Sequence, residues 1–225
     1  MPGPPAILFD LDGTLVDSVY QHVLAWRDAL EREGIDLSVW RIHRRIGMSG
    51  GVFAQALLRE TGVPLSSEIQ ERLLRGHADA YRELSAQVRP LPGARELLAD
   101  LTTLRVPWAI ATSGRLESAR PTLDMLEVPD DVPIVTRDLV ERAKPDPDLF
   151  LEAAARLEAD IMDAVVVGDS VWDLLAAQRA HALGVGLLAG GYGREELERA
   201  GAFRVYEDPA DLRRHLDEVG VRTSG

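Results

Sequence analysis

Two short segments of the sequence bring aspartates close together. Asp10 and Asp12 flank a leucine in FDLDGT, and a second pair stands four residues apart in GDSVWD. Carboxylates gathered at one place repel one another strongly unless a cation compensates them. Ligation by oxygen alone, without histidine or cysteine, suits Mg²⁺, which commonly bridges to a phosphate group. We therefore expect a magnesium site formed by Asp10, Asp12, Asp169 and Asp173.

The same residues suit phosphoryl transfer. A carboxylate nucleophile can form an aspartyl-phosphate, and the transferring oxygens then need hydrogen-bond donors and positive charge. Thr112 and Ser113, which follow an apolar run, offer donors, and Lys144 offers charge. Lys144 is also the only lysine of the chain. A compact ammonium that must contact both a carboxylate and a phosphate explains that choice; chance survival of a surface lysine is the alternative.

Short apolar runs that alternate with helical patterns position these residues. The runs lie at 6–9, 108–112, 132–135, 164–168, 185–188 and 202–205. Strands separated by helices of the observed length predict an α/β fold with a parallel sheet and helices on both faces. Ligands of such sheets bind beyond the carboxyl ends of the strands. Asp10, Thr112 and Asp169 each follow one of the predicted strands, so we expect them at one edge of the sheet.

Residues 18–88 do not fit this alternation. Apolar residues recur there at helical spacing, with breaks at 47–51 and 61–64, and nothing alternates like a strand. We therefore expect an all-helical insert at 18–88. The α/β core would then be built from residues 1–17 and 89–225.

Composition excludes several classes of protein and partner. The absence of cysteine rules out disulfides and thiol catalysis. The formal net charge of −12 disfavours binding to nucleic acid or to an anionic membrane, and no apolar run is long enough to span a bilayer. We expect a cytoplasmic enzyme, monomeric or homodimeric, whose partner is a small-molecule phosphate ester.

Four motifs in one order resemble those of the haloacid dehalogenase-like superfamily, in its branch of phosphoglycolate phosphatases and β-phosphoglucomutases. They are FDLDGTLVDS (9–18), IATSG (110–114), AKPDP (143–147) and VVVGDSVWD (165–173). The resemblance covers nearly the whole chain. It implies a Rossmann-like core, a helical cap domain at 18–88, and Mg²⁺-dependent hydrolysis of a phosphate monoester.

The resemblance also implies individual roles. Asp10 would be the nucleophile and a Mg²⁺ ligand, and Asp12 would be the general acid and base, with its backbone carbonyl facing the metal. Thr112 would hydrogen-bond the phosphate, while Lys144 would pair with both Asp10 and the phosphate. Asp169 would ligate Mg²⁺ directly. Asp173 would support the metal indirectly, without ligating it; a solvated helix residue is the alternative interpretation.

The helical insert, as the resemblance has it, closes over the site and sorts substrates. Gly50, in the segment GMSGG, would bring backbone amides toward an anion, and Arg45 would bind a second anionic group. A turn between helices and a surface arginine are the simpler readings of the same residues. One departure from the family pattern is His181, which replaces a usual glycine where we expect a helix end away from the chemistry.

Other functions remain to be weighed against a phosphatase. A phosphomutase shares the whole site and differs in whether water or a sugar hydroxyl accepts the phosphoryl group. A phosphate-binding module without activity would typically lack one of the key residues, yet Asp10, Asp12, Lys144 and Asp169 are all present. Dehalogenation would leave Asp12 without a role, and phosphonate cleavage through a Schiff base needs a cap lysine that this chain lacks.

Overall fold

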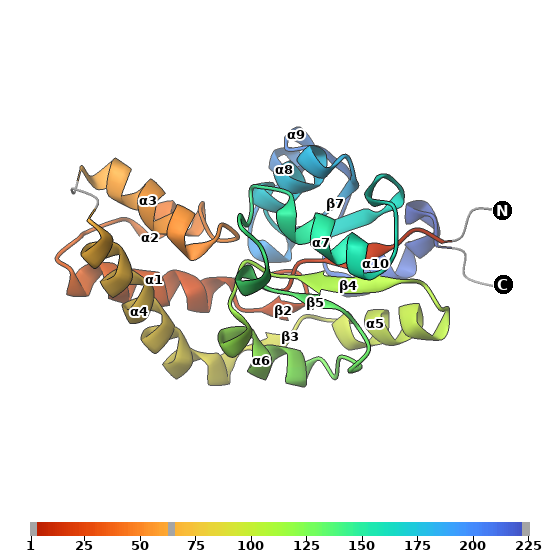
Figure 1. Cartoon of the computed structure of the whole chain (residues 1–225), viewed down its shortest axis with the longest axis horizontal. Coiled ribbons are helices and arrows are strands. Elements are labelled where there is room, and N and C mark those ends of the chain that lie inside the picture. The colour runs from red at the N-terminus through yellow and green to blue at the C-terminus, as the bar shows by residue number, and fades with distance from the viewer. Residues whose placement is uncertain (1–3, 63–65, 222–225) are drawn as a thin grey trace. The chain divides into compact units, whose positions relative to one another are not determined.

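The computed structural model describes residues 4–62 and 66–221, which form two compact units. One unit combines the chain up to Asp17 with the chain from Arg89 onward, and the other is Ser18–Val88. The first contains a parallel sheet covered by helices, and the second is helical (Figure 1). The predicted fold class, a Rossmann-like α/β core with a helical insert, is confirmed.

A six-stranded parallel sheet forms the centre of the α/β unit, in the order β5-β4-β1-β6-β7-β8. The strands are β1 (Ile7–Phe9), β4 (Trp108–Ala111), β5 (Ile134–Val135), β6 (Val165–Gly168), β7 (Leu183–Leu187) and β8 (Ala202–Tyr206). Strand β1 lies between β4 and β6, and the strand order runs in opposite directions on its two sides. This reversal is the point at which open parallel sheets bind ligands.

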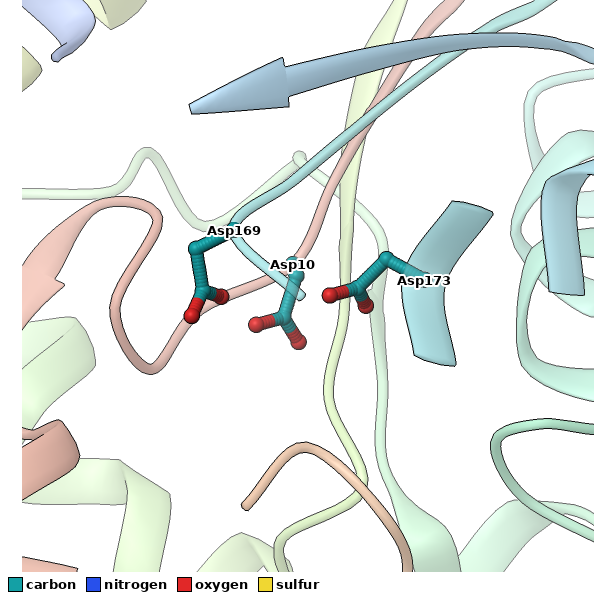
Figure 2. Close-up of side chains that lie close together, drawn as sticks. All are labelled: Asp10, Asp169 and Asp173. Carbon is teal, nitrogen blue, oxygen red and sulfur yellow. The ribbon is translucent and has the colours of Figure 1, made fainter. Parts of the chain in front are cut away.

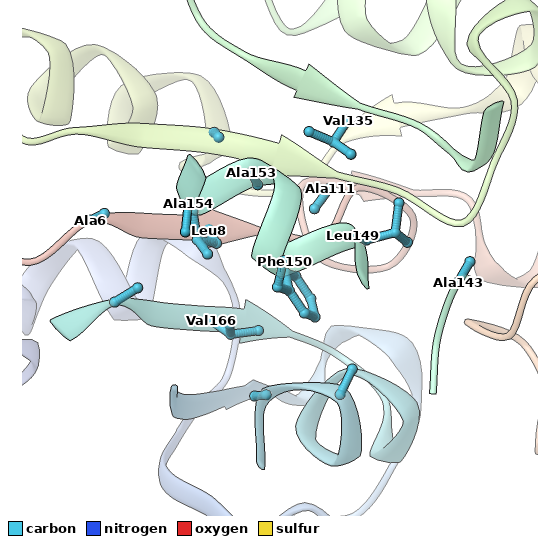
Figure 3. Packing of buried hydrophobic residues seen from close by; sticks show 14 residues of the cluster. Ala6, Leu8, Ala111, Val135, Ala143, Leu149, Phe150, Ala153, Ala154 and Val166 are labelled. Atoms are coloured by element: carbon cyan, nitrogen blue, oxygen red, sulfur yellow. The ribbon is translucent and has the colours of Figure 1, made fainter. Parts of the chain in front are cut away.

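Every residue of the central strands β1, β4 and β6 is buried. Since successive side chains of a strand point to opposite faces, both faces of these strands are covered. On one face, the rings of Phe9 and Trp108 meet edge to face with their centroids 6.5 Å apart. On the other face, Leu8 and Val166 belong to a cluster of fourteen buried residues (Figure 3). Strands of this kind read as continuous apolar runs, which is why the sequence pattern revealed them.

Helices cover this sheet. They are α5 (Ala94–Thr103), α6 (Leu116–Met125), α7 (Asp148–Arg156), α8 (Val171–Ala180), α9 (Arg194–Arg199) and α10 (Pro209–Arg214). Short 3₁₀ turns lie at η2 (Arg137–Leu139), η3 (Ile161–Asp163), η4 (Leu188–Gly190) and η5 (Leu216–Val219). Helix α7 packs Phe150 and two alanines, Ala153 and Ala154, against the sheet (Figure 3). Full burial of the Phe150 ring contributes roughly 1.5–3 kcal/mol.

The second unit contains α1 (Val19–Arg32), α2 (Val39–His43), α3 (Gly50–Thr61), α4 (Ser67–Leu84) and the 3₁₀ turn η1 (Ser85–Gln87). Its described residues, 18–62 and 66–88, include no strand. The core of the unit is apolar and centres on Trp26, whose ring stacks on Phe53 with centroids 4.1 Å apart. Across the described parts of both units, no helix is sufficiently long and apolar to cross a membrane.

The sequence patterns did not reveal a small antiparallel ribbon. Strands β2 (Val16–Asp17) and β3 (Arg89–Pro90) pair with each other at the points where the chain leaves and re-enters the α/β unit. Each strand has only two residues, and about seventy residues separate them. Strands this short leave no periodicity in the sequence, and no turn motif joins them, so their pairing could not be predicted.

His181 ends helix α8 in a left-handed conformation, with φ of +62°. This conformation costs a residue with a Cβ atom about 1–2 kcal/mol, and glycine escapes that cost. Part of the gain is lost because glycine adds freedom to the unfolded chain. We expect His181→Gly to raise the free energy of unfolding by about 0.5–1 kcal/mol, measurable by urea denaturation.

Gln178→Gly is the matched control for that substitution. Gln178 is exposed inside the same helix, where glycine should lower the free energy of unfolding by roughly 1 kcal/mol. Equal losses from both substitutions would contradict the role assigned to the left-handed backbone of His181.

Candidate active site

Three buried aspartates converge at the carboxyl edge of the sheet (Figure 2). Asp10 directly follows β1, Asp169 directly follows β6, and Asp173 lies in the first turn of α8. One carboxylate oxygen from each lies within 4.8 Å of those of the other two. Because β1 and β6 are adjacent and parallel, their ends bring Asp10 and Asp169 together.

Lys144 lies against two of these carboxylates. It is 0% exposed, and its Nζ forms ion pairs with Asp10 and, at 2.8 Å, with Oδ1 of Asp173. The same ammonium lies 5.1 Å from the centroid of the Phe150 ring, close enough for a cation–π contact. A fully buried lysine paired in this way does not occupy a surface position. The alternative interpretation, that Lys144 is a surface lysine retained by chance, is therefore wrong.

Burial shapes the protonation of the cluster. It raises the pKa of Asp10 to about 7, because the attraction of Lys144 only partly offsets desolvation and the charges of Asp173 and Asp12. Burial likewise raises the pKa of Asp169 well above its ordinary value. For Lys144, burial alone would lower the pKa, but the carboxylates of Asp10 and Asp173 outweigh it and raise the pKa.

The donor set fits a divalent cation. Three buried carboxylates face a single ammonium, so full ionisation leaves an excess of two negative charges without water to screen them. A hard divalent cation balances that charge and prefers oxygen ligands. Asp10, Asp169 and Asp173 are the described residues whose oxygens could hold such a cation.

Asp173 is held at both of its carboxylate oxygens. Its Oδ1 pairs with Lys144, and its Oδ2 accepts hydrogen bonds from the backbone N–H of Ser170 at 3.1 Å and from the Ser170 hydroxyl at 2.6 Å. Ser170 and Asp173 thereby form a capping box at the start of α8, in which the Ser170 side chain accepts from the backbone N–H of Asp173. Asp173 therefore joins the beginning of the helix to the lysine.

Sequence reasoning assigned no role to several residues that support the aspartates. The Thr14 hydroxyl donates to Oδ1 of Asp169 over 3.1 Å. Two glycines make room: a Cβ atom on Gly190 would overlap the Asp169 carboxylate, and one on Gly168 would overlap the Asp173 side chain. Thr14 lies inside the FDLDGT motif, which was a usable signal. Nothing in the local sequence marks Gly190 as different from an ordinary loop glycine.

The remaining predicted site residues of the α/β unit lie near the same edge. Asp12 is partly exposed and does not belong to the group of three carboxylates, although its charge contributes to raising the pKa of Asp10. Thr112 directly follows β4, the other neighbour of β1, and is buried. Its Oγ1 accepts a hydrogen bond from the N–H of Gly114 at 3.0 Å. Ser113 is half-buried and follows Thr112.

Arg45 and Gly50 belong to the helical unit, where both make contacts with other residues of that unit. The Arg45 guanidinium pairs with Glu60 and also donates to the carbonyl oxygen of Arg41 at 3.1 Å. Gly50 is the first residue of α3, so the break predicted at 47–51 ends at Ser49, two residues earlier than predicted. A Cβ atom on Gly50 would approach Leu74 to 2.8 Å, so close packing between α3 and α4 accounts for this glycine.

A buried carboxylate cluster with raised pKa values, at the switch point of a parallel sheet, is typical of a functional site. Residues 4–181 match the haloacid dehalogenase-like hydrolases, and the chain belongs to that family. The resemblance stated from the four motifs is thereby confirmed.

The similarity to other proteins covers nearly the whole chain. A phosphoglycolate phosphatase of Caulobacter vibrioides is 32% identical, over 92% of this chain and 88% of its own length. A β-phosphoglucomutase of Bacillus subtilis is 31% identical, over 92% and 91% respectively. The crystal structure of a hydrolase from Pseudomonas syringae is 54% identical and superposes with a TM-score of 0.93, over 96% of this chain and 99% of that one.

Proposed function

We propose that this chain is a Mg²⁺-dependent phosphatase that hydrolyses a small-molecule phosphate monoester through an aspartyl-phosphate on Asp10. Family membership and the phosphatase relative make it a phosphoric monoester hydrolase. The observation that carries the finer proposal is the position of Asp10, which is buried, paired with Lys144 and within reach of Asp169.

Asp10 would attack the phosphorus atom, and the bond between phosphorus and the ester oxygen would break. The departing oxygen takes a proton from Asp12, whose partial exposure leaves it accessible to substrate and water. In the second half of the reaction, Asp12 accepts a proton from water as that water attacks the phosphorus. Inorganic phosphate leaves, and the Asp10 carboxylate is restored.

Charge compensation supports this sequence of steps. Lys144 holds the Asp10 carboxylate in place and supplies positive charge beside the transferring group. Thr112 would hydrogen-bond a phosphate oxygen, and Ser113 lies beside it. Mg²⁺, held by Asp10, Asp169 and the backbone carbonyl of Asp12, would supply the positive charge that lets an anionic nucleophile approach an anionic ester. Asp173 would support the site through Lys144.

The helical unit, residues 18–88, is proposed as the cap domain that selects the substrate. Arg45 would bind an anionic group of that substrate. Because its guanidinium pairs with Glu60, such a group would have to share Arg45 with that carboxylate. The amide of Gly50 at the start of α3 would contribute a further donor. The names of the relatives support a phosphoglycolate-like or sugar-phosphate-like substrate.

Metal removal tests the dependence on Mg²⁺. We expect phosphate release from a panel of esters, including 2-phosphoglycolate and hexose phosphates, when Mg²⁺ is present. EDTA should lower the rate by roughly 100-fold or more, because a cation contributes several kcal/mol to such a transition state. Added Mg²⁺ in excess over EDTA should restore it. Equal rates with EDTA and with Mg²⁺ would contradict the metal assignment.

A phosphomutase is the second candidate, supported by the relative named β-phosphoglucomutase. It would transfer the phosphoryl group from Asp10 to a sugar hydroxyl instead of water. Such an enzyme would isomerise a hexose 1-phosphate in the presence of a hexose bisphosphate and release little inorganic phosphate. Phosphate release that is stoichiometric with ester consumption excludes this alternative.

A further inference from the structure

Lys144 lies in a segment without helix or strand. Residues 140–147 connect η2 to α7, and the segment is fixed by a few separate contacts. The N–H of Arg142 donates to Asp148 at 3.2 Å, and the N–H of Asp146 donates to the carbonyl oxygen of Ala143 at 3.2 Å. The position of the lysine therefore depends on contacts that other elements make with this segment.

One of those contacts comes from the far end of helix α8. Arg179, in the last turn of the helix, donates from Nη1 to the carbonyl oxygen of Pro145 at 2.8 Å. The same Nη1 lies 3.6 Å from Oδ1 of Asp146. Pro145 directly follows the lysine, so this bond fixes the backbone next to Lys144.

Helix α8 thus contacts both Lys144 and the residue that follows it. Asp173, in the first turn, pairs with the Nζ atom, and Arg179, in the last turn, holds the adjacent backbone. Asp173 and Arg179 are six positions apart on the helix, which corresponds to about 9 Å along its axis. Because a helix is stiff over that length, it fixes the distance between the base of the lysine side chain and its tip.

We propose that Arg179 is a positioning residue that keeps Lys144 against the Asp10 and Asp173 carboxylates by anchoring the 140–147 segment to α8. The kinetic part of this proposal rests on the proposed phosphatase function; the structural part does not. Arg179 is 50% exposed, so its ion pair with Asp146 adds little to the stability of the whole fold. Its loss should act locally, on how often the segment opens.

The single lysine makes the structural part measurable without any substrate. Acetylation of the folded protein by an N-hydroxysuccinimide ester, followed by mass spectrometry of the peptide that contains Lys144, reports how often this buried amine becomes accessible. We expect Arg179→Ala to increase the acetylation rate of Lys144 by about tenfold. Arg179→Lys, which retains a cationic donor, should stay within roughly threefold of the wild type.

Arg156→Ala is the matched control. Arg156 lies on the neighbouring helix α7 and makes an exposed ion pair with Glu152, four residues earlier. This substitution should leave the acetylation rate of Lys144 unchanged. The proposal is overturned if Arg179→Ala does not accelerate acetylation, or if Arg156→Ala accelerates it equally.

Steady-state kinetics supplies the second readout. Arg179→Ala should lower kcat by about tenfold, because a small displacement of a catalytic group is costly, and Arg179→Lys should recover most of the loss. A stability role alone would instead lower the thermal midpoint and leave kcat per folded molecule unchanged. If the wild type releases no phosphate at all, the phosphatase proposal fails, while the acetylation comparison still decides the role of Arg179.

Discussion

Replacing Asp10 with asparagine is expected to lower phosphate release by about ten-thousand-fold or more, since it removes the attacking oxygen itself. Asparagine has nearly the shape of aspartate, so the substitution leaves the packing of this edge intact. It also removes a charge that burial disfavours, as the raised pKa of Asp10 indicates. The metal-free variant should therefore be at least as stable as the wild type at pH 8.

Two measurements separate a chemical effect from misfolding. Initial rates of phosphate release give the loss of activity, and thermal unfolding in EDTA gives the stability. Asp130→Asn, the same charge change at an exposed position, is the control and should retain full activity. An Asp10→Asn protein that folds normally and keeps more than about one hundredth of the wild-type rate would rule out Asp10 as the nucleophile.

Replacing Lys144 with methionine should produce the second large effect. The substitution leaves Asp10 and Asp173 buried without their cation. Removing one partner of a buried ion pair typically costs about 3–5 kcal/mol, and we expect a loss of this size in the free energy of unfolding at pH 8 in EDTA. Activity should fall by roughly a thousandfold, because the charge beside the reacting group is lost.

The destabilisation should depend on pH in a defined direction. Burial already raises the pKa of Asp10 to about 7 in the wild type, whereas an unfolded aspartate titrates near 4. A raised pKa means that folding favours the protonated group, so this contribution to stability is fully present below about pH 4. It is lost as the pH rises through the folded pKa. Without Lys144, the folded pKa should rise further, and the variant should regain stability between pH 8 and pH 5.

Urea denaturation at pH 5 and at pH 8 measures this effect. Arg156→Met serves as a control, since an exposed ion pair contributes only about 0–1 kcal/mol at either pH. A Lys144→Met protein with the same stability and activity as the wild type would show that the buried ammonium is dispensable.

The ends of the strands could be predicted because the burial of a strand leaves a pattern in a short stretch of sequence. A strand buried on both faces must be apolar along its length, so Asp10, Thr112 and Asp169 stood out as the first polar residues after such runs. Parallel pairing then brings the ends of neighbouring strands to one edge. The helical character of residues 18–88 could also be predicted, because their apolar residues recur at helical spacing and do not alternate as in a strand.

The contacts that hold the site together depend on the tertiary structure, which the sequence does not display. The pairing of Lys144 with Asp173 was not predicted, since only the folded segment 140–147 brings these two residues together. The requirement for glycine at position 190 likewise comes from Asp169, more than twenty residues earlier in the chain. The roles of Arg45 and Gly50 toward a substrate stay predictions, because they depend on the substrate as well as on the chain.

The β2–β3 ribbon has a consequence for how this protein tolerates change in length. Seen from the α/β unit, the helical insert is one long loop. The pairing of β2 with β3 holds the two ends of this loop next to each other, with Asp17 opposite Arg89. The entropy of closing a loop grows only logarithmically with its length, so about seventy residues cost roughly 2 kcal/mol more than an eight-residue connection. The chain could exchange this insert for a shorter or longer one at little thermodynamic cost to the sheet that carries the aspartates.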